Sequence, residues 1–369
     1  STKDRALVQC HDIGLEFFTN TNNKMSIKVW VGGGLGRTPI IGSVIKNELE
    51  WEHILTYCEA ILRVYNLYGR RDNMYKARIK ILVKSLGIEA FKKLVEDEWK
   101  YIKNGPNTIN AEELSRVKKY FSEPNYKKDI KNNLKDYDSN KAFSQWLSRA
   151  TNTHKKTGYR AVTFSLKETG CAPGDASSTQ MKAVSKLADE YSFGEIRVSH
   201  EQNLILADVQ EDKLYELWIK AKEHHLVTPN IGLLTDIICC PGGDFCSLAN
   251  AKSIPIAQSI QDLFDDMDYL HDIGDLNLNI SGCMNACGHH HVGHIGILGV
   301  DKDGSEWYQV TLGGNQGNFA SIGKVIGPSF SAEQMPSIVK KIIEVYLNNR
   351  QKEEIFIDCV SRIGLEPFK

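Results

Sequence analysis

No stretch of the 369-residue chain is apolar over the length that a membrane-spanning helix needs. Residues 1–5 also lack the apolar segment of a secretory signal peptide. Neither charge is in large excess, because the formal net charge is −1. These absences argue against a membrane and against nucleic acid as partners, and they predict a cytoplasmic protein.

Two common nucleotide-binding patterns are absent as well. Arg37 stands where the third glycine of a GxGxxG motif would fall after the glycine-rich stretch 32–36, and no Gly-Lys-Ser/Thr follows it. A plain tight turn would explain these glycines. Glycine also lets a flat ligand come close to the backbone, because it has no Cβ, and the recurrence of the stretch favours this second interpretation.

The chain contains an internal repeat. Residues 31–45 (VGGGLGRTPIIGSVI) and 312–326 (LGGNQGNFASIGKVI) match without a gap at an offset of 281 residues. In each copy, β-branched and aromatic runs precede the glycines and an apolar-periodic helix follows them. We therefore predict two copies of one α/β unit. The first copy lacks the segment that opens the second, so we expect an N-terminally truncated chain.

Two further segments lie between the copies. Residues 86–150 are charged and helical in period, with Trp99 and Trp146 as expected anchors. Residues 151–230 show the order β-α-β-β-α, which is typical of a ferredoxin-like half-domain. The predicted domains are a first unit lacking its start (1–85), a helical linker region (86–150), the half-domain (151–230), a second unit (231–350) and a C-terminal tail (351–369).

Nine cysteines are many for a chain without an export segment. In a reducing compartment, grouped cysteines bind metals more often than they form disulfides. Four are grouped, as C-x5-C at Cys240 and Cys246 and as C-x3-C at Cys283 and Cys287. Four thiolates hold either zinc or an iron–sulfur cluster; zinc sites prefer C-x2-C pairs, whereas wider loops suit a [4Fe–4S] cluster. Ser247 is expected to cap a helix over 249–264 beside it.

The stretch GHHHVGH at residues 288–294 suggests a second metal site. His290 and His294 have helical i, i+4 spacing, but the glutamate of an HExxH motif is missing. Valine and two glycines also disfavour a helix here. A polar turn beside the cysteines is therefore our preferred interpretation.

Several motifs together resemble the siroheme-dependent sulfite and nitrite reductases, over almost the whole chain. They are CPGGDFC, GCMNACG, LGGNQG, HDIGL, VGGGLGRTP, RVYNLYGRRDN and the ending IGLEPFK. The resemblance implies an α+β fold: a pseudo-twofold repeat of sulfite/nitrite reductase α/β units with one ferredoxin-like half-domain between them. It also implies that a [4Fe–4S] cluster is bound by Cys240, Cys246, Cys283 and Cys287, and that the Cys287 thiolate bridges the cluster to the siroheme iron.

The same resemblance implies a reaction and its partners. Electrons would pass from a ferredoxin or a flavoprotein to the cluster and on to siroheme, which reduces sulfite to sulfide or nitrite to ammonia. Siroheme carries many carboxylates, so its pocket needs cations and amides. The residues expected to contact it are Arg78, Lys80, Asn285, Asn315, Arg37 and Thr38.

The family's anion-binding cations belong to a part that should precede Ser1. The resemblance therefore implies that this chain is inactive on its own. Two alternatives stay open: a non-catalytic scaffold, either apo or holding only the cluster, and a structural zinc protein.

Overall fold

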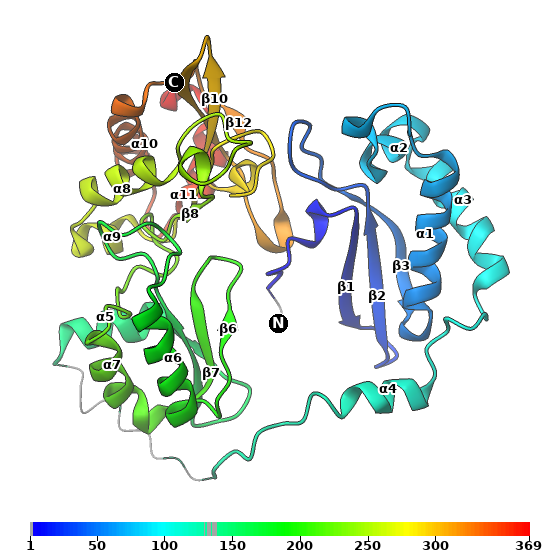
Figure 1. Ribbon diagram of the computed structural model, residues 1–369, viewed down its shortest axis with the longest axis horizontal. Helices are drawn as coiled ribbons and strands as arrows, with labels where there is room; N and C mark the ends of the chain where they lie inside the picture. The colour runs from blue at the N-terminus through cyan, green and yellow to red at the C-terminus, as the bar shows by residue number, and fades with distance from the viewer. Residues whose placement is uncertain (1–2, 129, 131–133, 135–138) are drawn as a thin grey trace. The chain divides into compact units, whose positions relative to one another are not determined.

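The computed structural model describes residues 3–128, 130, 134 and 139–369 (Figure 1). They form two compact units, Ser1–Glu123 with Gln316–Ile322 and Pro124–Asn315 with Gly323–Lys369. Each unit has apolar core clusters of its own. No helix in the described ranges is both long and apolar enough to cross a membrane.

The first unit is built on a three-stranded antiparallel sheet in the order β1-β2-β3. Its strands are β1 (Ile13–Thr19), β2 (Met25–Val31) and β3 (Ser43–Glu50). Alternate residues of the central strand, Ile27, Val29 and Val31, are fully buried, as the two-residue period of a strand requires. One face of this sheet therefore carries the apolar core.

Three helices pack with this sheet: α1 (Ile54–Tyr68), α2 (Ile79–Leu86) and α3 (Ile88–Ile102). Buried residues recur at helical spacing along α3, at Phe91, Val95 and Trp99. The Trp99 indole N–H donates to Thr56 Oγ1 at 3.0 Å, so its polar atom is satisfied inside the core. The expectation that Trp99 is an anchor is confirmed.

The second unit contains a four-stranded sheet in the order β4-β5-β7-β6. Its strands are β4 (Thr151–Thr153), β5 (Tyr159–Phe164), β6 (Arg197–Val198) and β7 (Leu204–Gln210), and its helices are α5 (Lys141–Ala150), α6 (Ser178–Tyr191) and α7 (Leu214–Lys222). The order from β5 to α7 is the predicted β-α-β-β-α. Trp146 on α5 is fully buried in this core, so the last helix before residue 151 packs with the half-domain.

The second unit also holds a five-stranded sheet in the order β12-β11-β10-β9-β8. Its strands are β8 (Ile238–Cys239), β9 (Leu278–Ser281), β10 (Ile295–Lys302), β11 (Ser305–Leu312) and β12 (Lys324–Val325). The helices α8 (Ile254–Leu263), α9 (Met267–Ile273), α10 (Met335–Asn349) and α11 (Phe356–Ile363) share its core. Strands β8, β9 and β10 are parallel to one another, so the carboxyl ends of β8 and β9 lie side by side at the same end of the sheet.

The predicted repeat is present in the local structure. Helices α1 and α10 each have 15 residues and stand at the same offset as the glycines. In the first copy, Gly32 N–H donates to the Asp12 carbonyl at 3.0 Å; in the second, Gly313 N–H donates to the His294 carbonyl at 3.2 Å. Gly32 and Gly313 have φ values of 75° and 83°, a backbone region that favours glycine, which explains why glycine stands at both positions.

Candidate metal centre

The four grouped cysteines come from two loops that leave neighbouring parallel strands. Cys240 directly follows β8, and Cys283 follows β9 by two residues. Both side chains are buried, whereas Cys246 is partly exposed and Cys287 is exposed. The fold thus brings the two cysteine pairs to the carboxyl ends of β8 and β9, with Cys287 exposed to solvent.

Glycines allow these two loops to touch. A Cβ on Gly242 would lie 2.4 Å from Ser253 N, and a Cβ on Gly282 would lie 2.6 Å from the Ala251 carbonyl oxygen. Neither distance is possible for a real Cβ, so any larger residue would push the loops apart. The Gly282 carbonyl oxygen accepts two bonds across the contact, from the N–H groups of Asn250 and Ala251 at 2.8 and 3.1 Å.

The helix expected over 249–264 starts later than predicted. Asn250 and Ala251 are used in this loop contact, and α8 begins at Ile254 with a proline in its first turn. The prediction that Ser247 caps the helix is therefore wrong. Ser253 precedes α8 instead, and its hydroxyl lies 3.5 Å from Sγ of Cys240. No sequence pattern marks Ser253 for this position.

The Cys287 thiol lies within electrostatic reach of the other three. The pKa of the Cys287 thiol is raised, first by burial and then by Cys240, Cys283 and Cys246. The Sγ of Cys240 also accepts a hydrogen bond from Gly282 N–H at 3.1 Å. Cys239 differs, because its thiol donates to the Cys240 carbonyl at 3.2 Å.

The donor set consists of four cysteine thiols on two neighbouring loops. Among the residues that the structure describes, no group of three or more His, Cys, Asp or Glu side chains is placed to hold a single metal ion. A [4Fe–4S] cluster takes each cysteine on a separate iron, so its four sulfurs stand further apart than the ligands of one zinc ion. The chemistry of the donor set, four cysteine thiols, therefore fits such a cluster.

The histidine stretch forms a turn, as expected, but it is not uniformly polar. Residues His290–Val292 make one turn of 3₁₀ helix. His290 is fully buried, and neither ring nitrogen has a hydrogen-bond partner among the described residues. Burial, followed by the neighbouring His291 and His289, lowers the pKa of His290 to about 3. His290 is consequently neutral in the folded chain.

We expect His290 to make folding depend on pH. In the unfolded chain, His290 binds a proton as the pH falls below its ordinary pKa of 6.5, whereas in the folded chain its pKa is about 3. The unfolded chain therefore binds more protons below pH 6.5, so the contribution of neutral His290 to the free energy of unfolding is full above pH 6.5 and decreases below it. At pH 5.5 the loss from this residue is about 1.4 kcal/mol. Urea unfolding of the iron-free chain at pH 7.5 and 5.5 measures it. On going from pH 7.5 to 5.5, the free energy of unfolding of His290→Phe should decrease by about 1.4 kcal/mol less than that of the wild-type chain. Equal decreases in the two proteins would contradict a neutral, buried His290.

His294 is held by neutral partners. Its Nδ1 accepts a hydrogen bond from Asn277 N–H at 3.2 Å, which leaves the proton on Nε2, 3.3 Å from Asn315 Oδ1. Burial lowers the pKa of His294. Asn315, one of the predicted siroheme contacts, thus lies beside His294 in the second glycine turn. Asn285, another, is exposed in the loop between Cys283 and Cys287.

The other predicted siroheme contacts gather at the glycine turn of the first unit. Arg78 forms a two-pronged ion pair with Asp12, at 3.0 and 2.8 Å. Arg37 and Thr38 are exposed on the turn itself. A Cβ on Gly34 would lie 2.8 Å from Nη2 of Arg78, so glycine makes room for the guanidinium.

Lys80 is buried beneath the same turn. Its ammonium group donates to the carbonyls of Leu35 and Thr38, both at 2.8 Å, and lies 3.5 Å from the Gly34 carbonyl oxygen. The pKa of Lys80 is lowered, first by burial and then by Arg78. Lys80 therefore shapes the turn through main-chain carbonyls.

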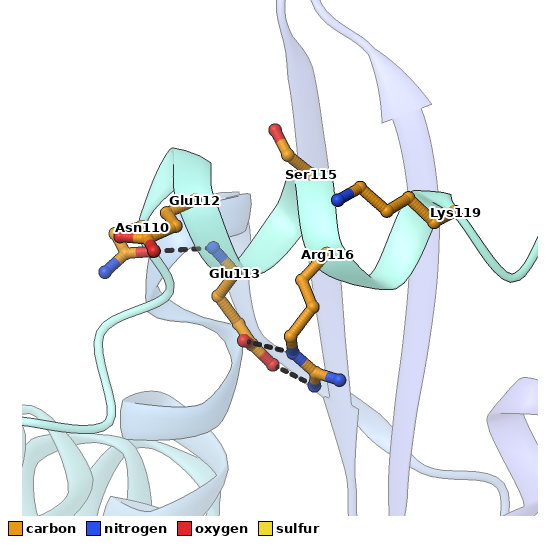
Figure 2. A pocket seen from close by; sticks show the side chains of 6 residues that line it. All are labelled: Asn110, Glu112, Glu113, Ser115, Arg116 and Lys119. Atoms are coloured by element: carbon orange, nitrogen blue, oxygen red, sulfur yellow. Dashed lines mark hydrogen bonds and ion pairs between the residues drawn. The ribbon is translucent and has the colours of Figure 1, made fainter.

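A separate hollow adjoins the short helix α4 (Ala111–Lys118) and holds none of the predicted site residues (Figure 2). Asn110 caps the helix by accepting a hydrogen bond from Glu113 N–H at 2.8 Å, and Glu113 pairs with Arg116. The lining residues are Asn110, Glu112, Glu113, Ser115, Arg116 and Lys119.

Two family models match the chain. A model described as "Nitrite and sulphite reductase 4Fe-4S domain" matches residues 1–103 and 233–369, which is more than half of the chain. A model described as "Nitrite/Sulfite reductase ferredoxin-like half domain" matches residues 153–224, between the two parts of the first. The predicted α+β fold, with repeated units on either side of a ferredoxin-like half-domain, is confirmed.

The chain is also similar to known proteins. A ferredoxin-dependent sulfite reductase (number 1) of Mycolicibacterium paratuberculosis is 24% identical over 98% of this chain and 60% of its own length. The ferredoxin–nitrite reductase of Synechococcus elongatus is 24% identical over 86% and 56%. The solved structure of NirA from Mycobacterium tuberculosis matches with a TM-score of 0.74 at 22% identity, covering 99% of this chain and 62% of that one. The chain therefore spans about 60% of these relatives' length.

Proposed function

Since this chain belongs to the family of nitrite and sulphite reductase 4Fe–4S domains, we propose that it holds the cluster of a siroheme-dependent sulfite or nitrite reductase. The proposed ligands are Cys240, Cys246, Cys283 and Cys287. One observation carries this proposal: the loops that follow the adjacent parallel strands β8 and β9 each carry two of the four cysteines, and Gly282 N–H, from one loop, donates to Sγ of Cys240 on the other at 3.1 Å.

The chain's own groups would prepare the thiolates for metal. Gly282 N–H supports negative charge on Sγ of Cys240, and the Ser253 hydroxyl stands within reach of the same sulfur. Such donors tune a bound cluster, because they stabilise the more negative sulfur. Cys287 is exposed whereas Cys240 and Cys283 are buried, which suits the bridging role implied for Cys287.

We propose the residues that the resemblance implies as candidate siroheme contacts, taken unit by unit. Arg37, Thr38 and Arg78 lie at the glycine turn of the first unit, whereas Asn315 lies in the second glycine turn and Asn285 in the cysteine loop. They offer the cation, hydroxyl and amide donors that carboxylates need. Lys80 would act by fixing the carbonyls of its turn. When bound, cluster and siroheme supply the one-electron steps of anion reduction; the chain's residues bind and orient them.

For the whole protein we propose sulfite or nitrite as the substrate. The names of the two relatives include ferredoxin. We propose a ferredoxin as the electron donor of this protein as well, with a flavoprotein as the alternative. A non-catalytic scaffold, apo or cluster-only, and a structural zinc protein are the competing functions.

Anaerobic reconstitution tests the proposal. The purified chain is incubated with ferrous iron and sulfide, with or without siroheme, and then desalted and assayed for metal, acid-labile sulfide and visible absorption. We expect four irons and four sulfides per chain and a brown colour, with an added heme band when siroheme is present. Iron and sulfide without a heme band would support the cluster-only scaffold. Tightly bound zinc with no sulfide uptake would contradict the proposal.

A further inference from the structure

Strand β8 lies at the outer edge of its sheet, immediately before the first proposed ligand, Cys240. Its inner side pairs with β9, where Cys239 is opposite Ile280. An edge strand presents main-chain N–H and C=O groups to its other side, and a buried pair of such groups needs partners. Cys239 is buried, so its main-chain N–H and C=O, which point away from β9, need hydrogen-bond partners within the protein.

A glutamine side chain from the ferredoxin-like half-domain provides both partners. Gln202 Nε2–H donates to the Cys239 carbonyl at 2.9 Å, and Cys239 N–H donates to Gln202 Oε1 at 2.9 Å. A primary amide carries the same donor and acceptor as a peptide group. Gln202 therefore takes the place that a neighbouring strand would occupy beside β8.

The backbone of Gln202 is held in an unusual conformation. Its φ is 59°, in the left-handed region that residues other than glycine seldom adopt. Gly174 packs against it, and a Cβ on Gly174 would lie 3.0 Å from Cβ of Gln202. The next residue, Asn203, is fully buried and donates to Asp236 Oδ1 at 3.0 Å. A strained residue fixed from both sides points to a function for its side chain.

We propose that Gln202 is a positioning residue for the metal centre. Through its two bonds to Cys239 it fixes the main chain from which Cys240 projects, while Cys240 N–H is fixed on the other side by the Ile280 carbonyl at 3.1 Å. The ferredoxin-like half-domain thereby contributes to holding the cluster, although it supplies none of the proposed ligands. This inference rests on the proposed cluster-binding function.

The test compares Gln202→Met, which keeps the length of the side chain but removes both hydrogen bonds, with Gln258→Met. The control is chosen because the Gln258 side chain also donates a hydrogen bond to a main-chain carbonyl, that of Gly170 at 3.1 Å, which Gln258→Met removes. The whole chain is reconstituted with iron and sulfide, and the rate of iron release to a chelator is followed. Loss of a group that orients a ligand typically weakens metal binding about tenfold or more. We expect release on the order of tenfold faster from Gln202→Met, and an unchanged rate from Gln258→Met.

A second readout separates positioning from simple stability. Melting temperatures of the iron-free variants should fall more for Gln202→Met, which leaves the buried N–H and C=O of Cys239 unpaired, than for Gln258→Met, whose lost bond is exposed. The cluster's midpoint potential should move only in Gln202→Met. Should Gln202→Met not fold, Gln202→Glu, which retains an acceptor for Cys239 N–H, replaces it with the same expectation of faster release. Wild-type release rates and potentials in the Gln202 variants would overturn this inference alone. Failure of the wild-type chain to take up iron would overturn the proposed function with it.

Discussion

Serine in place of Cys240, Cys246, Cys283 or Cys287 is expected to abolish the reconstituted cluster. Each thiol would hold one iron, and a serine hydroxyl at neutral pH is a far poorer ligand for iron than a thiolate. In each of the four variants, the iron and sulfide content per chain should fall from four of each to a small remaining fraction. Iron and acid-labile sulfide analysis after desalting measures the change.

Cys239→Ser is the matched control for this series. Cys239 is adjacent to Cys240 and equally buried, but its thiol donates to a main-chain carbonyl, and serine can make the same bond. Burial, followed by the charge of Cys240, raises the pKa of the Cys239 thiol, which disfavours the thiolate that iron needs. The control should keep its cluster. Loss of the cluster in Cys239→Ser with retention in Cys240→Ser would move the ligand set by one residue.

The sequence predicted those features that depend on short-range pattern. Paired cysteine spacing, recurring glycines and periodic apolar residues are local, and they led to the cysteine loops, the repeated unit and the β-α-β-β-α segment. The start of α8 could not be predicted in this way. It depends on Asn250 and Ala251 bonding to Gly282, a loop contact between residues distant in sequence, and such contacts leave no local pattern.

The roles of Gln202 and Ser253 escaped prediction for the same reason. Gln202 bonds to Cys239, 37 residues away, and the Ser253 hydroxyl lies near Sγ of Cys240, 13 residues away. The residues next to Gln202 and Ser253 in the sequence do not mark either contact. Positive φ at Gln202 would have been informative, but it is a property of the folded backbone alone.

The two copies of the repeated unit differ in the side chains at their glycine turns. Asp12 and His294 stand at equivalent places, as the matching bonds from Gly32 and Gly313 show. In the first copy Asp12 pairs with Arg78, next to the space left by Gly34; in the second, His294 faces an asparagine, Asn315, instead. One copy thus presents a charged pair and the other a neutral pair at the same turn.

A buried ion pair anchors the ferredoxin-like half-domain to the segment that leads to Cys240. Lys167 and Asp236 meet at 2.6 Å, with side chains 0% and 5% exposed, and the Lys167 ammonium also donates to the Glu201 carbonyl. Asn203 and Gly232 N–H donate to the Asp236 carboxylate as well. Every member of this network is hydrogen-bonded, so removing the lysine leaves a buried carboxylate without its countercharge.

Lys167→Met is therefore expected to destabilise the chain by about 3–5 kcal/mol, because an unpaired buried charge costs far more than the lost attraction. Lys141→Met, which breaks an exposed pair with Asp268, should cost less than about 1 kcal/mol. Urea unfolding of the iron-free chains measures both. The double variant Lys167→Met/Asp236→Asn should recover most of the loss, since an asparagine needs no countercharge. If Lys167→Met costs no more than Lys141→Met, the network contributes little to stability. If the double variant is no more stable than the single one, the loss comes from packing around the lysine stem and not from an uncompensated charge.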